Sequence, residues 1–585
     1  MSQFFDPKFK NHDYSSDLVE RFDKSKVKED DILGYEFQHA HYVKHESGKS
    51  DILFIREWVH LKDGRRLLNY RVVKNYERPY WLTKPHLRTH TDVLEYAPLE
   101  MVDEYRCPQW CLEQDIAENL RYYGRDRSLK ALAATKWLYG ANISPISYIR
   151  HEYRKRWPNC KSPSSTVAWV DSETDMHGTD ETIIVQASYK KRAIVAVVRW
   201  WIEDQANISE RFYEALYKMM GEVIEKRQCN VELLIVENAG EAVAEVMKRV
   251  HSWETDYAEV WNINYDVPRF GNVLDKYGFN PGHVFCHPEV PEGYRQAFYI
   301  KGPEKRTSKK GIEFKMDSKE QWDTFDVPGP VWIDGMQYYY NRRRVNGKMS
   351  ASLDACLKRH TPYSKIKFNC GVLENTADWH KKMQKDFKIE YLVYAAGDCI
   401  FGEILDEEIG DLSTYFKVDL GNTDLKSFTS LPKQFNDSFH HFIYDNERHV
   451  LGCPSNSLGS EFDSILIDQY DWIVTLPTHN LEPKGIPVIK GLPNLRSNIL
   501  VHSADADVVR TYPMVTVNAN VSRETCYKEP TTQMVGMTEQ ERREFSVNWT
   551  GADVNAIQLC VMGLGLIYPD EWVELYDKQK QKELA

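Results

Sequence analysis

Apolar runs of strand length alternate with amphipathic stretches of helix length through the middle of this chain. The runs TVAWVDSET, ETIIVQASY and VELLIVE have the length and apolar character of buried strands, whereas RFYEALYKMMGEVIEKR repeats its apolar residues at helical spacing. Strands that alternate with helices are typical of an α/β domain. We therefore expect an α/β domain over residues 166–410.

The segments before this domain follow other patterns. Short alternating runs over residues 35–82, separated by turn residues such as KDG, predict antiparallel strands. A helical stretch is expected over residues 112–138. The basic, proline-containing segment HEYRKRWPNCKSPSS, residues 151–165, is predicted to be a linker. Residues 1–165 are thus expected to form an N-terminal, β-rich domain.

Length and composition set the broad class of protein. A chain of 585 residues is too long for one hydrophobic core, so three or four domains are expected. Its 42% hydrophobic and 28% charged residues are ordinary for a globular protein. The sequence has no apolar run of membrane-spanning length and a polar N-terminus, which argues against a membrane span and against secretion. The scattered cysteines favour a reducing compartment, so we expect a cytoplasmic protein, in the host cytoplasm if it is viral.

The formal net charge of −12 does not by itself indicate a nucleic-acid partner. The distribution of charge matters more than the total, because basic residues can cluster on one surface. A site that holds Mg²⁺ over phosphates also adds carboxylates, and these lower the total charge. An acidic chain is therefore compatible with a metal-dependent enzyme that acts on nucleic acid.

Three short acidic motifs lie in the expected α/β domain. Asp171 and Glu173 stand in VDSET at the end of an apolar strand, and Asp266 stands in WNINYDVP at the start of another element. The third motif, YAAGD, places Tyr394 and Asp398 one turn apart in a predicted helix. Because residues i and i+2 of a strand face the same side, Asp171 and Glu173 should present two carboxylates together.

This set of side chains suits phosphodiester hydrolysis. The reaction needs an in-line water and a stabilised leaving oxygen, and two divalent metals about 4 Å apart can provide both. Since Mg²⁺ prefers carboxylate oxygens and water, we expect the four carboxylates to form a cage for two Mg²⁺ ions, with Mn²⁺ as an alternative. The hydroxyl of Tyr394 would orient the attacking water. Each motif alone would more often be a solvated strand end or a helix cap, and only their order and settings together favour catalysis.

The three motifs resemble the exonuclease motifs of the DEDD superfamily, in its tyrosine-containing subclass, as found in family B DNA polymerases of T-even-type bacteriophages. The resemblance implies a ribonuclease H-like 3′→5′ exonuclease domain with a mixed sheet, in which the four carboxylates bind metal and Tyr394 positions water. It also implies that Asn262, which matches the asparagine of the second motif, contacts DNA. The segment DGMQYYYNRRRVNGKMSASLDACLKRH resembles the part of these polymerases that follows a hairpin.

A basic loop lies between the second and third motifs, within YIKGPEKRTSKKGIEFKM. Its tip carries Lys305, Arg306, Lys309 and Lys310. In one interpretation these side chains contact DNA phosphates, since the resemblance implies a hairpin that helps to pass the primer strand between two active sites. In the other interpretation the loop is a solvated hairpin. The basic stretches 154–156 and 342–344 have the same two interpretations, with solvation favoured.

Near the C-terminus, ADVVRTYPM followed by VTVNANVSRET is similar to the first polymerase motif of family B enzymes. The resemblance implies that residues 491–585 begin a polymerase palm, and that residues 411–490 form a connecting segment that returns to the N-terminal domain. Asp507 would bind the catalytic metals with a contribution from the carbonyl of Val508. Tyr512 would stack under the sugar of an incoming nucleotide. The alternative is a strand followed by a Tyr-Pro turn.

The match to a polymerase is incomplete. Arg510, Thr511 and Met514 depart from the family pattern, which leaves the details of the nucleotide pocket open. Sixty residues follow Thr525, and they contain neither a lysine-rich fingers helix nor a D-T-D metal motif. Because a two-metal polymerase site needs a second carboxylate from that region, we expect this chain not to polymerise DNA alone.

The sequence therefore predicts the N-terminal, exonuclease-containing subunit of a split family B DNA polymerase, a multidomain protein of α/β and α+β class. Its expected partners are primer–template DNA, single-stranded 3′ ends and dNTPs, the last shared with a second polypeptide that carries the fingers, the thumb and the rest of the palm. A sliding clamp would be reached through that polypeptide, and no membrane partner is expected. The alternatives are a stand-alone 3′→5′ exonuclease, a non-catalytic replication scaffold and the truncated product of a longer gene.

Overall fold

The computed structural model describes residues 29–89, 94, 96–162, 164–307, 313–343 and 350–453. The chain divides into two compact units, Met1–Ser455 and Asn456–Ala585, and all described residues belong to the first. The predicted start of a palm, residues 491–585, therefore lies outside the described residues. None of the helices in the described part is long and apolar enough to cross a membrane.

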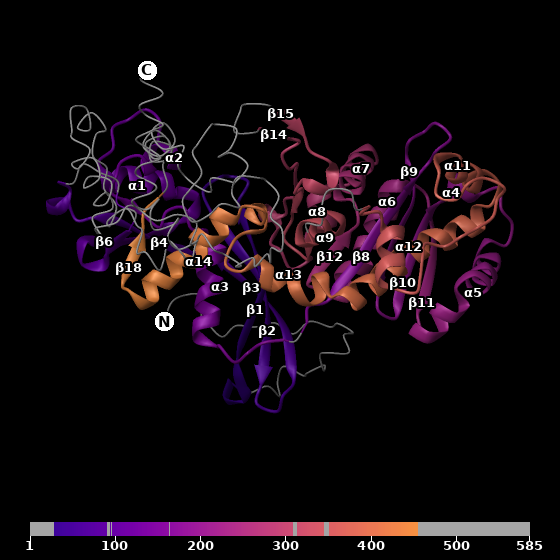
Figure 1. Ribbon diagram of the computed structural model, residues 1–585, viewed down its shortest axis with the longest axis horizontal. Helices are drawn as coiled ribbons and strands as arrows, with labels where there is room; N and C mark the ends of the chain where they lie inside the picture. The colour runs from indigo at the N-terminus through magenta and orange to yellow at the C-terminus, as the bar shows by residue number, and fades with distance from the viewer. Residues whose placement is uncertain are drawn as a thin grey trace, which may run out of the picture. The chain divides into compact units, whose positions relative to one another are not determined.

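A six-stranded mixed sheet forms the centre of the predicted α/β domain, in the order β11-β10-β9-β8-β12-β17. Its strands are β8 (Val167–Thr174), β9 (Thr182–Tyr189), β10 (Arg192–Val198), β11 (Asn230–Val236), β12 (Tyr257–Val260) and β17 (Val331–Asp334). β9 runs antiparallel to β8 and β10, whereas the other neighbouring pairs are parallel. The three predicted strands are confirmed, and with the helices they form the expected mixed α/β structure (Figure 1).

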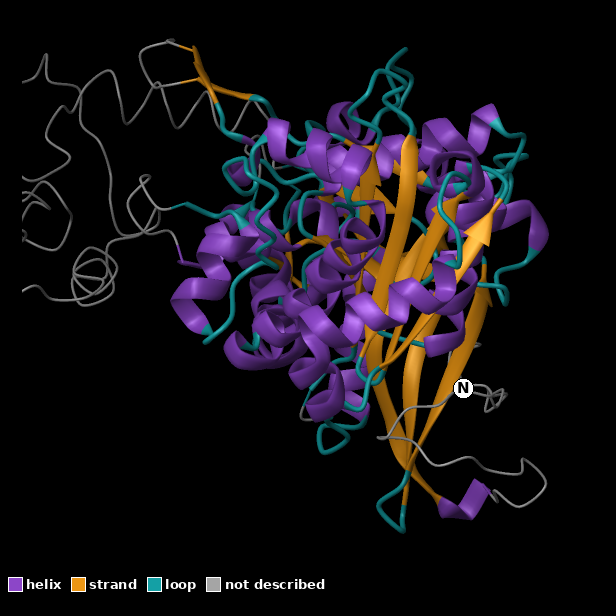
Figure 2. Cartoon of the chain, turned by 90° about the vertical axis from the view of Figure 1, so that its right-hand side faces the viewer, coloured by secondary structure: helices purple, strands orange, loops and turns teal. Residues whose placement is uncertain are grey.

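Helices cover both faces of this sheet (Figure 2). On one face, α5 (Ile208–Arg227) and α12 (Lys388–Ile409) pack together, with α12 against β8 and β9. On the other face, α6 (Ala239–Trp253) and α7 (Ile263–Lys276) pack together, with α6 against β9 and β10. Successive side chains of β8 point to opposite faces of the sheet. Its odd-numbered apolar residues therefore join the core under α12, and its even-numbered ones join the core under α6.

The predicted antiparallel strands near the N-terminus form a sheet of β1 (Ile32–Lys44), β2 (Asp51–Leu61) and β3 (Arg66–Lys74). The buried Arg56 of β2 joins this sheet to the central one. Its Nε donates to Oδ1 of Asp256 at 2.8 Å, and its Nη2 donates to the carbonyl of Glu254 at 2.5 Å. Asp256 directly precedes β12, so a hydrogen-bonded buried charge fixes the first sheet against the strand that enters the centre of the domain.

The predicted helical stretch over residues 112–138 is wrong in its extent. It contains α1 (Leu112–Leu120) and α2 (Leu129–Ala133), and it ends in β7 (Leu138–Tyr139), which pairs with β4 (Glu77–Thr83) beside β6 (Val102–Pro108). α1 stops at Arg121, which takes a left-handed φ of 56°. The hydroxyl of Ser128 then accepts from the backbone N–H of Ala131 at 3.4 Å and starts a new helix. Local caps therefore interrupt a pattern that favours a continuous helix.

The predicted linker over residues 151–165 is wrong in its first half. α3 (Pro145–Arg156) continues through it to Arg156. The side chain of Ser144 caps this helix and a proline occupies its first position, where the missing N–H costs nothing. Three basic residues fill the last turn, where positive charge suits the carboxyl end of a helix. The basic composition therefore marks a helix end as well as a linker.

The basic stretches that were expected to be solvated make contacts within the protein. Lys155 pairs with Asp445 at 2.5 Å, although its side chain stays largely exposed. Arg343 donates to both carboxylate oxygens of Asp411, at 2.6 and 2.9 Å. Residue 344 lies outside the described part of the chain. These pairs attach residues 411–453 to α3 and α9 (Gly335–Arg343).

The described part of the predicted connecting segment contacts the N-terminal region. Its elements are α13 (Phe416–Leu420), α14 (Leu431–Asn446) and β18 (His449–Leu451), and β18 pairs antiparallel with β5 (Tyr96–Pro98). His441 of α14 lies 3.0 Å from the hydroxyl of Ser147 in α3.

The remaining α-helices and strands of the described part are α4 (Arg199–Ile202), α8 (Pro281–Phe285), α10 (Leu353–His360), α11 (Ala377–Asp386), β13 (Phe298–Ile300), β14 (Lys305–Thr307), β15 (Glu313–Lys315) and β16 (Thr324–Asp326).

Two buried histidines should make the contact between α14 and α3 sensitive to acid. Burial lowers the pKa of His440 to about 3 and the pKa of His441 to about 2, and nearby cationic groups add to both shifts. An unfolded histidine has a pKa near 6.5, so this stability is complete above that pH and is lost as the pH falls below it. Each histidine should lower the free energy of unfolding by about 1.4 kcal/mol between pH 7.5 and pH 5.5.

Denaturant unfolding of the wild-type protein and the His441→Gln variant at both pH values measures this effect. Between pH 7.5 and pH 5.5, the free energy of unfolding should fall by about 1.4 kcal/mol less in the variant than in the wild type. A His86→Gln variant, altered at an exposed histidine, should follow the wild type. Equal losses in the wild type and His441→Gln would contradict the prediction.

Candidate metal centre

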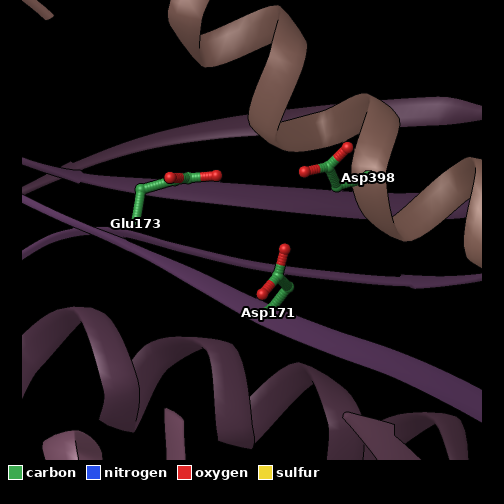
Figure 3. A group of neighbouring side chains, drawn as sticks. All are labelled: Asp171, Glu173 and Asp398. Carbon is green, nitrogen blue, oxygen red and sulfur yellow. The ribbon is translucent and has the colours of Figure 1, made fainter. Parts of the chain in front are cut away.

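Three carboxylates meet between β8 and α12. Asp171 and Glu173 occupy alternate positions of β8 and face α12, and Asp398 lies in the middle of that helix. One oxygen from each carboxylate lies within 4.8 Å of the others. Figure 3 shows the three side chains pointing toward one another. This group of buried and half-buried acids has the donor set and spacing of a site for a divalent cation.

Small residues in α12 allow the helix to approach the sheet closely. A Cβ atom at Gly402 would lie 2.1 Å from the ring of Trp169 in β8, and one at Gly397 would lie 2.5 Å from the side chain of Ile366. These contacts exclude larger side chains at both positions. Gly402 therefore allows the backbone of α12 to lie near β8, so that the short side chain of Asp398 reaches the carboxylates of the strand, and Gly397 allows the segment around Ile366 to pack against the same helix.

Each of the three carboxylates has one oxygen held by a neighbouring side chain. Gln186 Nε2 donates to Asp171 Oδ2 at 3.2 Å, and the hydroxyl of Tyr391 donates to Glu173 Oε2 at 2.6 Å. Lys365 Nζ lies 2.7 Å from Asp398 Oδ2. Oδ1 of Asp398 is buried and has no hydrogen-bond partner among the described residues.

This pattern fits a divalent cation. Outer partners that hold one oxygen of a ligand leave the second oxygen for the ion and fix its direction. A buried carboxylate oxygen without a partner is costly, and a cation at the centre would satisfy it. The donors are all carboxylates, the ligand type that Mg²⁺ and Mn²⁺ accept.

Burial and mutual repulsion raise the pKa values of the group. Burial, followed by the charge of Asp398, raises the pKa of Asp171 to about 7. Burial, followed by the charges of Asp171 and Asp398, raises the pKa of Glu173 to about 8. Burial also raises the pKa of Asp398, and the ammonium of Lys365 opposes that shift. The cluster is thus an electrostatically unfavourable arrangement that a cation would stabilise.

The fourth predicted carboxylate, Asp266, lies beside this group and not within it. It projects from the first turn of α7 and is buried, and its Oδ1 accepts from the hydroxyl of Ser172 at 2.5 Å. Ser172 faces the layer of α7 because it alternates with Asp171 and Glu173 along β8. The structure therefore gathers three of the four predicted carboxylates, and places the fourth against the residue between the first two.

Tyr394 lies at the edge of the group, as predicted from its spacing to Asp398. Its hydroxyl accepts from Lys365 Nζ at 2.9 Å, and its ring is almost completely buried. The same ammonium therefore contacts both Tyr394 and Asp398. Sequence reasoning missed Lys365, which lies in an irregular segment between α10 and α11 where no spacing links it to the motifs.

The predicted DNA-contact residues have different surroundings. Asn262 occupies the position before α7, and its Oδ1 is buried without a hydrogen-bond partner in the described structure. Lys305 lies on β14 of the predicted hairpin and pairs across it with Glu313 at 2.9 Å. Arg306 belongs to the same strand. Lys309 and Lys310 lie outside the described residues.

The predicted polymerase residues Asp507, Val508 and Tyr512 also lie outside the described part of the chain. A comparison of the chain with models of known protein families found no match. A comparison with curated proteins likewise found none. The function is therefore argued from the site.

Adding metal should stabilise the protein through these carboxylates. At pH 9, above the raised pKa values of Asp171 and Glu173, both of these carboxylates are charged, and repulsion within the cluster destabilises the metal-free fold. Mg²⁺ at about 100 times its dissociation constant should raise the free energy of unfolding by about 2.7 kcal/mol. Thermal unfolding with and without a chelator measures the shift.

A Glu173→Gln variant tests the assignment of that shift. Without metal it should unfold at a higher temperature than the wild type, because one of three like charges is gone. It should gain less from Mg²⁺, because a ligand is gone as well. An Asp378→Asn variant, altered at an exposed acid of α11, should behave like the wild type. A Mg²⁺ response that is unchanged in Glu173→Gln would place the ion elsewhere.

Proposed function

We propose that this chain is a metal-dependent 3′→5′ DNA exonuclease with a ribonuclease H-like domain. The main support is that two motifs far apart in sequence, the first and third of those that resemble family B exonuclease motifs, meet at one centre, with Asp266 of the second motif beside it. Asp171 and Glu173 from β8 and Asp398 from α12 lie within 4.8 Å, with Tyr394 at their edge. A mixed sheet with helices on both faces carries them.

The residues of the centre have separate roles in phosphodiester hydrolysis. When bound, divalent metal ions activate the attacking water and stabilise the charge on the leaving oxygen. Asp171, Glu173 and Asp398 hold the cation site. Lys365 donates to the hydroxyl oxygen of Tyr394, and the proton of that hydroxyl, beside Asp398, would orient a water molecule. Water adds to the terminal phosphorus, the bond to the 3′ oxygen of the preceding nucleotide breaks, and a 5′-dNMP leaves.

We further propose that the exonuclease is part of a family B DNA polymerase completed by a second polypeptide. The support is the sequence resemblance around Asp507 and Tyr512, together with the segment of residues 411–453 that runs back to the N-terminal region. In that setting the exonuclease would remove mispaired nucleotides from frayed 3′ ends. A co-purified polypeptide that restores dNTP incorporation would support this larger role.

Digestion of a single-stranded oligonucleotide labelled at its 5′ end tests the nuclease. Wild-type protein with Mg²⁺ should shorten it from the 3′ end one nucleotide at a time. The nuclease rate of the Asp171→Ala/Glu173→Ala variant should fall by more than ~100-fold. Substituting a side chain that only holds a metal ligand can already cost that much, and these two residues are ligands themselves. Asp378→Ala should keep wild-type activity. Shortening that persists in the double variant would assign the nuclease to a contaminant or to another site.

Lys365 should be needed for turnover. Lys365→Met removes the donor to Tyr394 and the positive charge beside Asp398, so kcat should fall by about 100-fold. The exposed Lys367, two residues further on, offers a matched Lys367→Met control that should stay close to the wild type. Equal rates for the two variants would remove Lys365 from the mechanism.

A further inference from the structure

A second tyrosine lies beside the proposed nuclease centre. Tyr391 precedes Tyr394 by one turn of α12, and the two rings stack with centroids 5.6 Å apart and an interplanar angle of 13°. Both side chains are buried. Their hydroxyl groups have different partners, because Tyr394 contacts Lys365 and Tyr391 contacts Glu173. The two tyrosines therefore serve different parts of the centre.

The chemistry of the groups around the Tyr391 hydroxyl determines which of them donate and which accept. A tyrosine hydroxyl has one proton, and the carboxylate of Glu173 only accepts once it is ionised, as a metal ligand is, so Tyr391 then donates to Glu173 Oε2, at 2.6 Å. Its other neighbours must then donate to its oxygen. They are Gln384 Nε2 at 3.3 Å and His380 Nδ1 at 2.9 Å. The proton of the neutral imidazole of His380 is therefore on Nδ1.

Gln384 connects this group to the end of β8. Its Nε2 donates to the carbonyl of Thr174 at 2.8 Å, and its Oε1 accepts from the backbone N–H of Met176 at 2.9 Å. The pairing of β8 with β9 is irregular at this point, with a register shift between Glu173 and Thr174. Gln384 thus adds a support to β8 just beyond Glu173, where the pairing with β9 is irregular.

Glu173 needs such a support more than the other two carboxylates. Its side chain has one more rotatable bond than an aspartate, and it stands at the irregular end of its strand. Asp171 lies within the regular ladder and Asp398 within a buried helix. Of the three ligands, Glu173 is therefore the one whose carboxylate position depends most on a contact from another element.

We propose that Tyr391 is a positioning residue, which holds one oxygen of Glu173 so that the other faces Asp171 and Asp398. The proposal rests on the proposed function, because it assigns Glu173 to a metal site. Tyr391 thereby contributes to cation binding, whereas Tyr394 contributes to turnover. His380 and Gln384 fix the hydroxyl of Tyr391 in turn.

Titration of the DNA-free protein with Mn²⁺, followed by electron paramagnetic resonance or calorimetry, tests the proposal. Tyr391→Phe should raise the dissociation constant by about tenfold, the lower end of what outer partners of metal ligands contribute. Tyr394→Phe should leave the dissociation constant close to that of the wild type. Tyr217→Phe, at an exposed tyrosine of α5, is the matched control.

Two further measurements separate positioning from a general loss of structure. In nuclease assays, Tyr391→Phe should need more Mn²⁺ for half-maximal rate and recover with excess metal, whereas Tyr394→Phe should keep the wild-type metal dependence at a reduced kcat. His380→Phe, which removes the Nδ1–H donor and leaves Tyr391 in place, should weaken Mn²⁺ binding in the same direction by a smaller factor. It serves as the test if Tyr391→Phe does not fold.

The outcomes distinguish this inference from the proposed function. Wild-type protein that binds no Mn²⁺, or binds it equally after Asp171→Ala/Glu173→Ala, would overturn the nuclease proposal and the positioning role with it. Wild-type protein that binds Mn²⁺ through these carboxylates, with unchanged affinity in Tyr391→Phe and His380→Phe, would overturn only the positioning role.

Discussion

Mutual repulsion of three closely spaced carboxylates is the constraint on which the rest of the site depends. Two unit charges about 5 Å apart repel by about 3 kcal/mol at an effective dielectric constant of about 20, and this cluster contains three such pairs. The surrounding fold must hold the groups together against that repulsion. Lys365 compensates part of it at Asp398, and Gln186 and Tyr391 each donate one hydrogen bond to the others.

The backbone supplies the remaining restraint. β8 is a central strand of the sheet, with β9 on one side and β12 on the other, so it cannot move without breaking two sets of hydrogen bonds. Trp169, two residues before Asp171, is buried against α12, and full burial of a large apolar side chain contributes about 1.5–3 kcal/mol. Apolar packing along the same strand and helix that carry the acids thus offsets the repulsion among them.

The sequence predicted the regular parts of this arrangement. β8, β9, β11, α5 and α12 follow from local periodicity, and the pairing of Asp171 with Glu173 follows from the two-residue repeat of a strand. The break at Arg121 and the extension of α3 to Arg156 were missed, because a left-handed cap and a helix-terminal basic cluster resemble a continuing helix and a linker in composition. Lys365 and Tyr391 were missed for another reason, since no spacing links Lys365 to the motifs, and the one-turn spacing of Tyr391 to Tyr394 does not by itself reveal its contact with Glu173.

The short motif around Asp171 has a property that spacing alone did not reveal. Asp171 and Glu173 face α12, and Ser172 between them faces α7, where its hydroxyl holds Asp266 at 2.5 Å. One strand segment therefore positions acids on both of its faces, two directly and one through a hydroxyl. A shift of β8 by one residue would exchange these faces and disperse all four groups. The register of β8 thus determines where the carboxylates of both layers lie. The pairing of β8 with its two neighbours is therefore as necessary to the centre as the acids themselves.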